Sequence, residues 1–403
     1  MNECKNGFTY NPLNKKCIDI KKTPIFPIEI KKELIQYKNK FSNIKKFKKK
    51  IFPFVNRVSA NIYNRINYYN NIKKYFKFKN FENKCLRFYK FNNNGKPIYR
   101  IGNSLILNNR IGSDSANGIV FLSSFRDKNL NLFKFASKIV VHEHKVNKEL
   151  KILFKLSQLV LNNKCPHFPI LYNILYCKNF NDFNNSSFIH SNTKHTQIIS
   201  LFPKIIKKNK YSKFTLTLNE LANGDLQTFM NNNINYPSAV YLNAFAQIFI
   251  SLIFFYKYIK SYHNDAHWGN FLFHRIKSKG FFHYKIYNTN YFLKNLGFLW
   301  VIWDYEYSIP FNSSTATNIN PYIDIYRIIH AFIPELYNGW VPDDNYKLSK
   351  DNANFFIDIK QKLKNFKNLN SLTIFILTTL INFNIIQTKK PKNIINKTPF
   401  IID

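Results

Sequence analysis

The most constraining feature of the sequence is a polar loop enclosed between two apolar segments. The long apolar run 241–262 predicts a buried helix, and Phe271-Leu272-Phe273 predicts a short strand. Between them, residues 263–270 read His-Asn-Asp-Ala-His-Trp-Gly-Asn, with a carboxylate at Asp265 and an amide at Asn270. Because both flanking segments are apolar, we expect the core to hold this loop rigidly and to present the two polar side chains together.

Such a loop suits a site in which a base faces a hydroxyl and an oxygen ligand faces a metal ion. Another carboxylate, Asp304, follows the apolar run 298–303, as expected for a strand that ends at a metal. Magnesium prefers carboxylate and carbonyl oxygens, so Asp and Asn are suitable ligands. A zinc site on His263 and His267 is the alternative. Its context favours a loop over a helix, and the sequence offers no third ligand.

The pattern from His263 through Asp265 to Asn270 closely resembles the catalytic loop of the protein-kinase-like superfamily, His-x-Asp-x-x-x-x-Asn. Asp304 resembles the aspartate of that superfamily's Asp-Phe-Gly element, although Tyr and Glu follow it here. The resemblance implies an α+β, bilobal fold, with a small β-rich N-lobe containing one main helix and a larger, mostly helical C-lobe. It also implies that Asp265 accepts the proton of the acceptor hydroxyl, while Asn270 and Asp304 bind magnesium (Mg2+). Asp324, at the start of a predicted helix, is expected either to support the loop or to lie free at that helix N-terminus.

A predicted strand over residues 133–140 contains Ala-x-Lys and resembles the third strand of the kinase N-lobe. The resemblance implies that Lys138 reaches the alpha and beta phosphates of ATP and needs a carboxylate to hold it. Glu149, on a predicted amphipathic helix, is the leading candidate, and Glu143 is the alternative. The alternative is that Glu149 forms only a surface ion pair with Lys145 or Lys148.

Two more segments complete the nucleotide site that the resemblance implies. Residues 111–121 resemble a glycine-rich loop whose small residues let backbone amides approach phosphates, although the middle glycine is absent; an ordinary hairpin is the alternative. Residues 214–226 resemble the hinge, whose backbone groups near residues 220 and 222 receive adenine. The nucleotide-binding residues implied are Ile111, Gly112, Gly118, Val120, Ala136, Lys138, Glu220, Ala222, Asp225, Asn270 and Asp304.

The identity of the phosphoryl acceptor depends on features outside this set. His267-x-Gly-Asn replaces the Lys-Pro-Glu-Asn of ordinary protein kinases and is similar to aminoglycoside and choline phosphotransferases, and no Ala-Pro-Glu motif follows Asp304. The hinge-like segment and the N-terminus instead resemble serine/threonine protein kinases of large DNA viruses. We therefore expect transfer to a protein hydroxyl. A small-molecule kinase, a scaffolding pseudokinase and a basic nucleic-acid-binding protein are the alternatives.

The first 30 residues place Cys4 and Cys17 around Asn11-Pro12, a spacing similar to the two-cysteine adaptor domain of large DNA viruses of invertebrates. The resemblance implies that residues 1–22 bind a tethering partner. An unstructured segment with incidental thiols is the alternative. A zinc site is not expected, because two thiols with no nearby histidine leave a tetrahedral shell half empty.

Composition bears most on residues 31–94, which we predict to be a basic linker. The chain has 60 Lys+Arg against 22 Asp+Glu, a formal charge of +38, and residues 31–90 interleave lysines with aromatic residues. This pattern predicts salt-sensitive contact with nucleic acid or an anionic surface. An AT-rich genome, whose codons favour Lys, Asn, Ile, Phe and Tyr, is the alternative explanation.

The kinase-like N-lobe is predicted over residues 95–222 and the C-lobe over 223–403, with a Pro- and Lys-containing tail from Lys389. Five cysteines and the lack of a signal-peptide pattern argue against a secreted disulfide framework. We expect an intracellular protein, found in the host cytoplasm and also in the virion if it is viral. Polar residues interrupt the apolar runs 244–256 and 372–386, so no transmembrane segment is expected.

Overall fold

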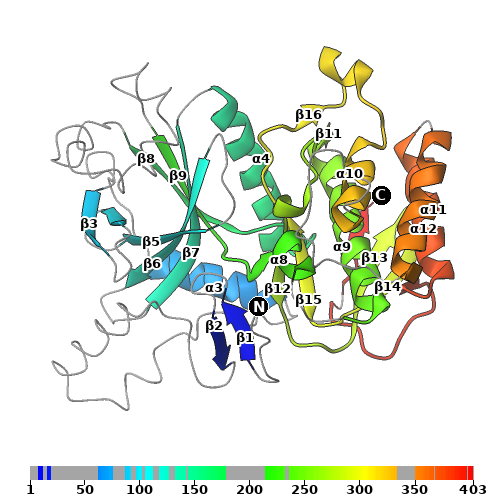
Figure 1. Cartoon of the computed structure of the whole chain (residues 1–403), viewed down its shortest axis with the longest axis horizontal. Coiled ribbons are helices and arrows are strands. Elements are labelled where there is room, and N and C mark those ends of the chain that lie inside the picture. The colour runs from blue at the N-terminus through cyan, green and yellow to red at the C-terminus, as the bar shows by residue number, and fades with distance from the viewer. Residues whose placement is uncertain are drawn as a thin grey trace.

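The structure is a computed structural model of the 403-residue chain. It describes residues 8–11, 16–19, 62–75, 87–91, 97–101, 105–111, 118–126, 132–141, 144–177, 214–231, 236–333, 350–366, 368–396 and 398–402. A seven-stranded sheet with helices beside it forms one part, called the sheet region below, and a mostly helical part with smaller sheets, the helical region, follows it (Figure 1). The chain is therefore α+β, as predicted, and most of its described strand pairs are antiparallel.

The large sheet is antiparallel throughout, and one of its interior strands, β7, carries the predicted lysine. Its order is β3 (Arg87–Phe91), β4 (Pro97–Ile101), β5 (Leu105–Ile111), β6 (Gly118–Arg126), β7 (Leu132–Val141), β9 (Phe214–Asn219) and β8 (Leu171–Cys177). On β7, Lys138 lies opposite Val120 of β6 and Thr217 of β9. Strands on both sides bury β7, which suits its run of aromatic and β-branched residues.

Helix α4 (His144–Leu161) follows β7 and turns an apolar face inward. Leu150, Leu153 and Leu156 are buried at helical spacing, whereas Phe154 on the other face is exposed. This is the helix that the sequence predicted after the lysine strand. A short buried segment, residues 165–170, then leads into β8.

Helix α3 (Ile62–Tyr75) corrects the prediction of a basic linker over residues 31–94. It packs beside α4 and β8, with Arg65 and Ile72 buried and Tyr69 stacked on Tyr172. Strand β3 also lies entirely inside the predicted linker. The rest of residues 31–94 lies outside the described residues, so the predicted nucleic-acid or anionic-surface contact stays a prediction.

The helical region is built around α9 (Ser238–Ile259), where the sequence predicted the central helix. Around it lie α8 (Leu226–Met230), α10 (Ile323–Phe332), α11 (Lys350–Lys362) and α12 (Leu369–Asn382). Phe245 of α9 packs edge-on against Phe332, Phe355 and Phe356. A helix that is apolar on all sides needs such a complete cover.

By length and composition α9 is able to cross a membrane, and among the described residues it is the one helix of at least 18 residues with this property. However, 78% of its apolar window is buried inside the protein. Its buried Gln247 is also satisfied, because its amide donates to the Phe298 carbonyl and accepts from the Trp300 amide. These contacts agree with the prediction of no transmembrane segment.

Three small sheets complete the helical region. They pair β10 (Gly224–Asp225), β12 (Phe271–Arg275) and β15 (Phe298–Ile302); β11 (Ser261–Tyr262) and β16 (Ile309–Pro310); and β17 (Ile386–Gln387), β14 (Thr289–Lys294), β13 (Phe281–Ile286) and β18 (Phe400–Ile402). The predicted tail from Lys389 is wrong at its end. There β18 runs parallel to β13, with Phe400 and Ile402 buried.

Near the N-terminus, β1 (Phe8–Asn11) and β2 (Lys16–Asp19) form an antiparallel pair in which Tyr10 lies opposite Cys17. The unstructured alternative for this segment is therefore wrong over these two strands. Cys4 lies outside the described residues. The tethering role of residues 1–22 stays a prediction.

Candidate active site

The polar loop is anchored from behind by a carboxylate of the next helix. Asp324, in the first turn of α10, accepts hydrogen bonds from the amides of His263 and Asn264, each at 2.7 Å, and from the Tyr256 hydroxyl at 3.0 Å. Arg327 of the same helix donates to the Asn264 carbonyl. Asp324 is fully buried, so it supports the loop and does not lie free at the helix N-terminus.

Within the loop, Asn270 holds Asp265. Its side-chain nitrogen donates to Asp265 Oδ2 at 3.0 Å and to the Asp265 carbonyl at 2.9 Å. The amide oxygen of Asn270 is therefore left to accept or to ligate. Asp265 is partly exposed, and no described residue hydrogen-bonds to its other oxygen, Oδ1.

His267 contacts the same carboxylate oxygen. The Gly269 amide donates to His267 Nδ1 at 3.1 Å, so Nε2 carries the proton, and Nε2 lies 3.6 Å from Asp265 Oδ2. The absence of a side chain at Gly269 permits this, because a Cβ there would lie 2.9 Å from His267 Cε1. Burial raises the pKa of Asp265, but the hydrogen bonds and charges of His267, His263 and Asn270 outweigh it and lower the pKa below its usual value.

The predicted lysine lies between two carboxylates. Lys138 Nζ is 2.8 Å from Glu149 Oε1 and 3.0 Å from Asp304 Oδ1, and both Lys138 and Glu149 are buried. Burial opposes the charge of Lys138, but the two carboxylates outweigh it and raise the pKa. Glu149 is thus the partner of Lys138 and not part of an exposed helical pair. The alternative, Glu143, lies outside the described residues.

Two hydrogen bonds join the loop to Trp303, the residue before Asp304. The Trp303 amide donates to the Asn270 carbonyl at 2.9 Å, and His263 Nε2 donates to the Trp303 carbonyl at 3.0 Å. Asp304 itself has a φ of 62°, a left-handed conformation that Asp tolerates better than most residues. The chain therefore turns at Asp304 and presents its carboxylate to Lys138.

The acidic groups around Asp304 offer ligand atoms for a hard cation. Carboxylate oxygens of Glu149, Asp304 and Glu306 lie within 4.8 Å of one another, and the amide oxygen of Asn270 is available. Such oxygen donors fit magnesium. Glu306 was not predicted, although its place two residues after Asp304 is a usable signal. The zinc alternative gains no support, because the ligand cluster found among the described residues contains neither His263 nor His267.

The predicted nucleotide-binding residues of the sheet region lie on neighbouring strands. Ile111 of β5 is opposite Val120 of β6, and Val120 is opposite Lys138. Ala136 lies two residues before Lys138 on β7, and Gly118 begins β6 opposite Val140. Gly112 is outside the described residues.

In the hinge-like segment, the amide and the carboxylate of Glu220 are both engaged within the protein. The Glu220 amide donates to the Ile170 carbonyl at 2.9 Å, and its buried carboxylate binds Arg65, so Glu220 does not offer its amide to a ligand. Ala222 is partly buried in the connection to β10. Asp225 caps α8, since it accepts a hydrogen bond from the Thr228 amide at 2.7 Å, and burial raises its pKa.

The structure thus brings together residues from β7, α4, the polar loop and the end of β15, which are far apart in the sequence. No model of a known protein family matches the chain, and no curated protein matches its sequence.

Proposed function

We propose that this protein is an ATP- and magnesium-dependent phosphotransferase with a bilobal, protein-kinase-like fold. The observation that carries the proposal is the connected set Glu149–Lys138–Asp304 beside the Asp265–Asn270 pair. The sheet region corresponds to the N-lobe and the helical region to the C-lobe. Phosphoryl transfer requires mainly positioning and charge neutralisation, and this set supplies a cation, a base and oxygen ligands in one place.

Asp265 is the proposed base. Asn270 and His267 both face its Oδ2, which leaves Oδ1 to accept the proton of the attacking hydroxyl. The lowered pKa of Asp265 keeps the carboxylate ionised at neutral pH. His267 and Asn270 orient it, and this pre-organisation is what general-base catalysis needs.

Lys138 is the proposed contact to the ATP phosphates. Its raised pKa keeps it cationic although it is buried, and Glu149 holds the side chain in place. Asn270 and Asp304, with Glu306 beside them, would hold the magnesium ion, which neutralises phosphate charge when bound. Val120 and Ala136 lie next to Lys138 in the sheet and would contact the nucleotide.

For the acceptor we propose a serine or threonine hydroxyl of a protein, as in the viral serine/threonine kinases that the sequence resembles. A small-molecule alcohol is the second candidate, and one observation favours it. Residues 305–322, between Asp304 and α10, contain a two-residue strand and one short 3-10 helix, η2 (Ser314–Asn318). This short segment gives an extended peptide little to bind.

The test compares the full-length protein with Asp265→Asn, which keeps the size of the side chain but removes the base. We expect the wild type to transfer label from ATP to test proteins when magnesium is present, and the variant to lose this activity. The matched control is Asp358→Asn, an exposed carboxylate of α11, which should keep full activity. Equal transfer by wild type and Asp265→Asn would contradict the proposal.

The acceptor is decided in the same assay by offering basic and acidic proteins beside aminoglycosides and small alcohols. Transfer to serine or threonine of a protein supports the first candidate. Transfer to small alcohols alone, still dependent on Asp265, would replace it with the second candidate and retain the phosphotransferase.

A further inference from the structure

Arg65 of α3 is buried in a polar network that the proposed chemistry does not use. Its Nε donates to Glu220 Oε1 at 2.8 Å and its Nη2 to Glu220 Oε2 at 2.6 Å, a two-pronged pair. The same guanidinium donates to the carbonyls of Pro166 and Phe168. Only 2% of Arg65 is exposed, so every contact is shielded from water.

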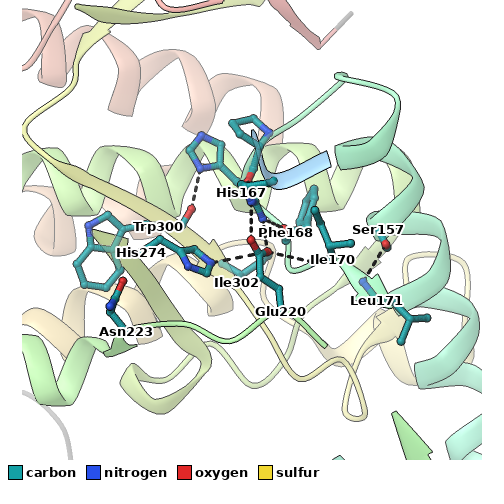
Figure 2. A network of polar contacts seen from close by, with 12 residues as sticks. Ser157, His167, Phe168, Ile170, Leu171, Glu220, Asn223, His274, Trp300 and Ile302 are labelled. Atoms are coloured by element: carbon teal, nitrogen blue, oxygen red, sulfur yellow. Dashed lines mark hydrogen bonds and ion pairs between the residues drawn. The ribbon is translucent and has the colours of Figure 1, made fainter. Parts of the chain in front are cut away.

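Glu220 lies where the sheet region passes into the helical region, directly after β9. Figure 2 shows its carboxylate near Ile170 on one side and His274 on the other. It accepts from the Ile170 amide at 3.2 Å, while its own amide donates to the Ile170 carbonyl. Arg65 therefore fixes the start of the connection 220–223 against residues 165–170.

Residues 165–170 also hold the strand that leads to Asp304. The His167 carbonyl accepts from the Ile302 amide at 3.2 Å, and His167 Nδ1 donates to the Trp300 carbonyl at 2.7 Å (Figure 2). Ile302 ends β15, two residues before Asp304. The Arg65 guanidinium thus contacts residues 165–170, and this segment touches both the connection 220–223 and strand β15, which leads to Asp304.

Helix α3 holds Arg65 in one position. The Tyr68 hydroxyl accepts from the Lys134 amide of β7 at 3.2 Å, Tyr69 stacks on Tyr172 of β8, and Ile72 is buried. With Arg65, these side chains occupy positions i, i+3, i+4 and i+7, which form one face of a helix. The docking is therefore specific, although α3 lies in a basic, Asn-rich stretch of the chain.

We propose that Arg65 is a positioning residue for ATP. It fixes the backbone of residues 220–223, so nucleotide affinity depends on a helix of the N-terminal basic segment. The inference rests on the proposed function. An apolar pair of the same size often stabilises a fold as well as a buried ion pair does. An apolar pair lacks the two parallel N–H donors of Arg65, which set the orientation of the Glu220 carboxylate.

The test separates orientation from stability with Arg65→Met combined with Glu220→Met, which removes both buried charges. We expect a folded protein whose loss of stability is limited to the Pro166 and Phe168 carbonyls that lose their donor. The KM for ATP should rise about tenfold or more, the equivalent of about 1.4 kcal/mol, with a smaller change in kcat. Amide exchange over residues 219–223 should become faster. Asn67→Ala, on the exposed face of α3, is the matched control and should change none of these.

Arg65→Lys is the second variant, in case the double variant does not fold. It keeps the charge but offers a single ammonium in place of the fork, so the KM for ATP should again rise. A wild-type KM and wild-type exchange over residues 219–223 in either folded variant would overturn the inference. If the wild type neither binds nor uses ATP, the proposed function fails by itself, and the exchange comparison still decides whether Arg65 fixes this connection.

Discussion

The polar loop and the Arg65 network are both built from buried hydrogen bonds, but they are assembled in opposite ways. The loop takes its central contact from residues five positions apart, and Asp265 remains partly exposed. The network joins Arg65 to Glu220 across 155 positions, and both side chains are buried. A base must meet a substrate from solvent, whereas a group that only fixes backbone geometry does not.

The comparison gives different expectations for substitutions in the two regions. Changes in the loop should reduce the rate and leave folding largely intact. Changes in the network should reduce the stability of folding first, because they leave a buried charge without its partner.

The largest expected effect is the loss of transfer in Asp265→Asn, by about 100- to 10,000-fold. Its unfolding free energy should stay within about 1 kcal/mol of the wild type, because the side chain is partly exposed and keeps its shape. Steady-state kinetics and urea unfolding measure the two quantities. If Asp265→Asn also lowered the unfolding free energy by several kcal/mol, the distinction between the polar loop and the Arg65 network would be lost.

Next comes Arg65→Ala, which leaves the Glu220 carboxylate buried and unpaired. We expect it to lower the unfolding free energy by about 3–5 kcal/mol, measured by urea denaturation. Lys362→Ala is the control. It breaks the exposed pair with Asp358, at 2.9 Å, and should cost at most about 1 kcal/mol. Similar losses in both variants would show that burial does not set the energy of the network.

A smaller effect concerns pH. Burial lowers the pKa of His274 to about 4, more strongly than the Glu220 charge raises it. Between pH 6.5 and 4 the unfolded histidine takes up a proton that the folded one does not, so stability falls as pH falls through this window. From pH 8 to pH 5 the loss is about 2 kcal/mol for this group. His274→Met should flatten the dependence by that amount; an unchanged slope would assign it to other groups, such as His167.

The smallest effect is expected for Gly269→Ala. The new Cβ would lie 2.9 Å from His267 Cε1, so the imidazole must move away from Asp265. We expect a loss of transfer of about tenfold, since misplaced catalytic groups cost rate, with little change in thermal unfolding. Wild-type kinetics in this variant would mean that the position of His267 does not affect the base.

Sequence reasoning located the loop because its contacts follow from local spacing. Asp265 and Asn270 lie in one short segment. Lys138 and Glu149 lie on a strand and a helix that the sequence patterns predict, and the kinase resemblance singled them out there. Arg65 was missed because lysines and asparagines of a biased composition surround the face that it forms with Tyr68 and Tyr69. Its partner lies 155 positions away, and no local pattern encodes such a distance.

The end of the helical region was missed for a similar reason. Residues 389–403 read as a tail, but Phe400 packs on Tyr284, with ring centroids 5.8 Å apart, because β18 pairs with β13. The backbone pairing of β18 with β13, more than 100 positions earlier, orders the end of the chain although residues 389–399 are largely polar. The pattern 400–402, alternating buried and exposed, is too short to predict a strand alone.

The pairing of β18 with β13 also sets an order for biosynthesis. The ribosome releases β13 long before it adds Phe400, so the face of Tyr284 stays uncovered while more than 100 further residues are made. Tyr284 is the side chain whose hydroxyl meets His167 Nε2, which belongs to the segment that Arg65 contacts. Closure of this part of the core therefore waits for a segment that is made long after β13, and until then Tyr284 lacks the cover of Phe400.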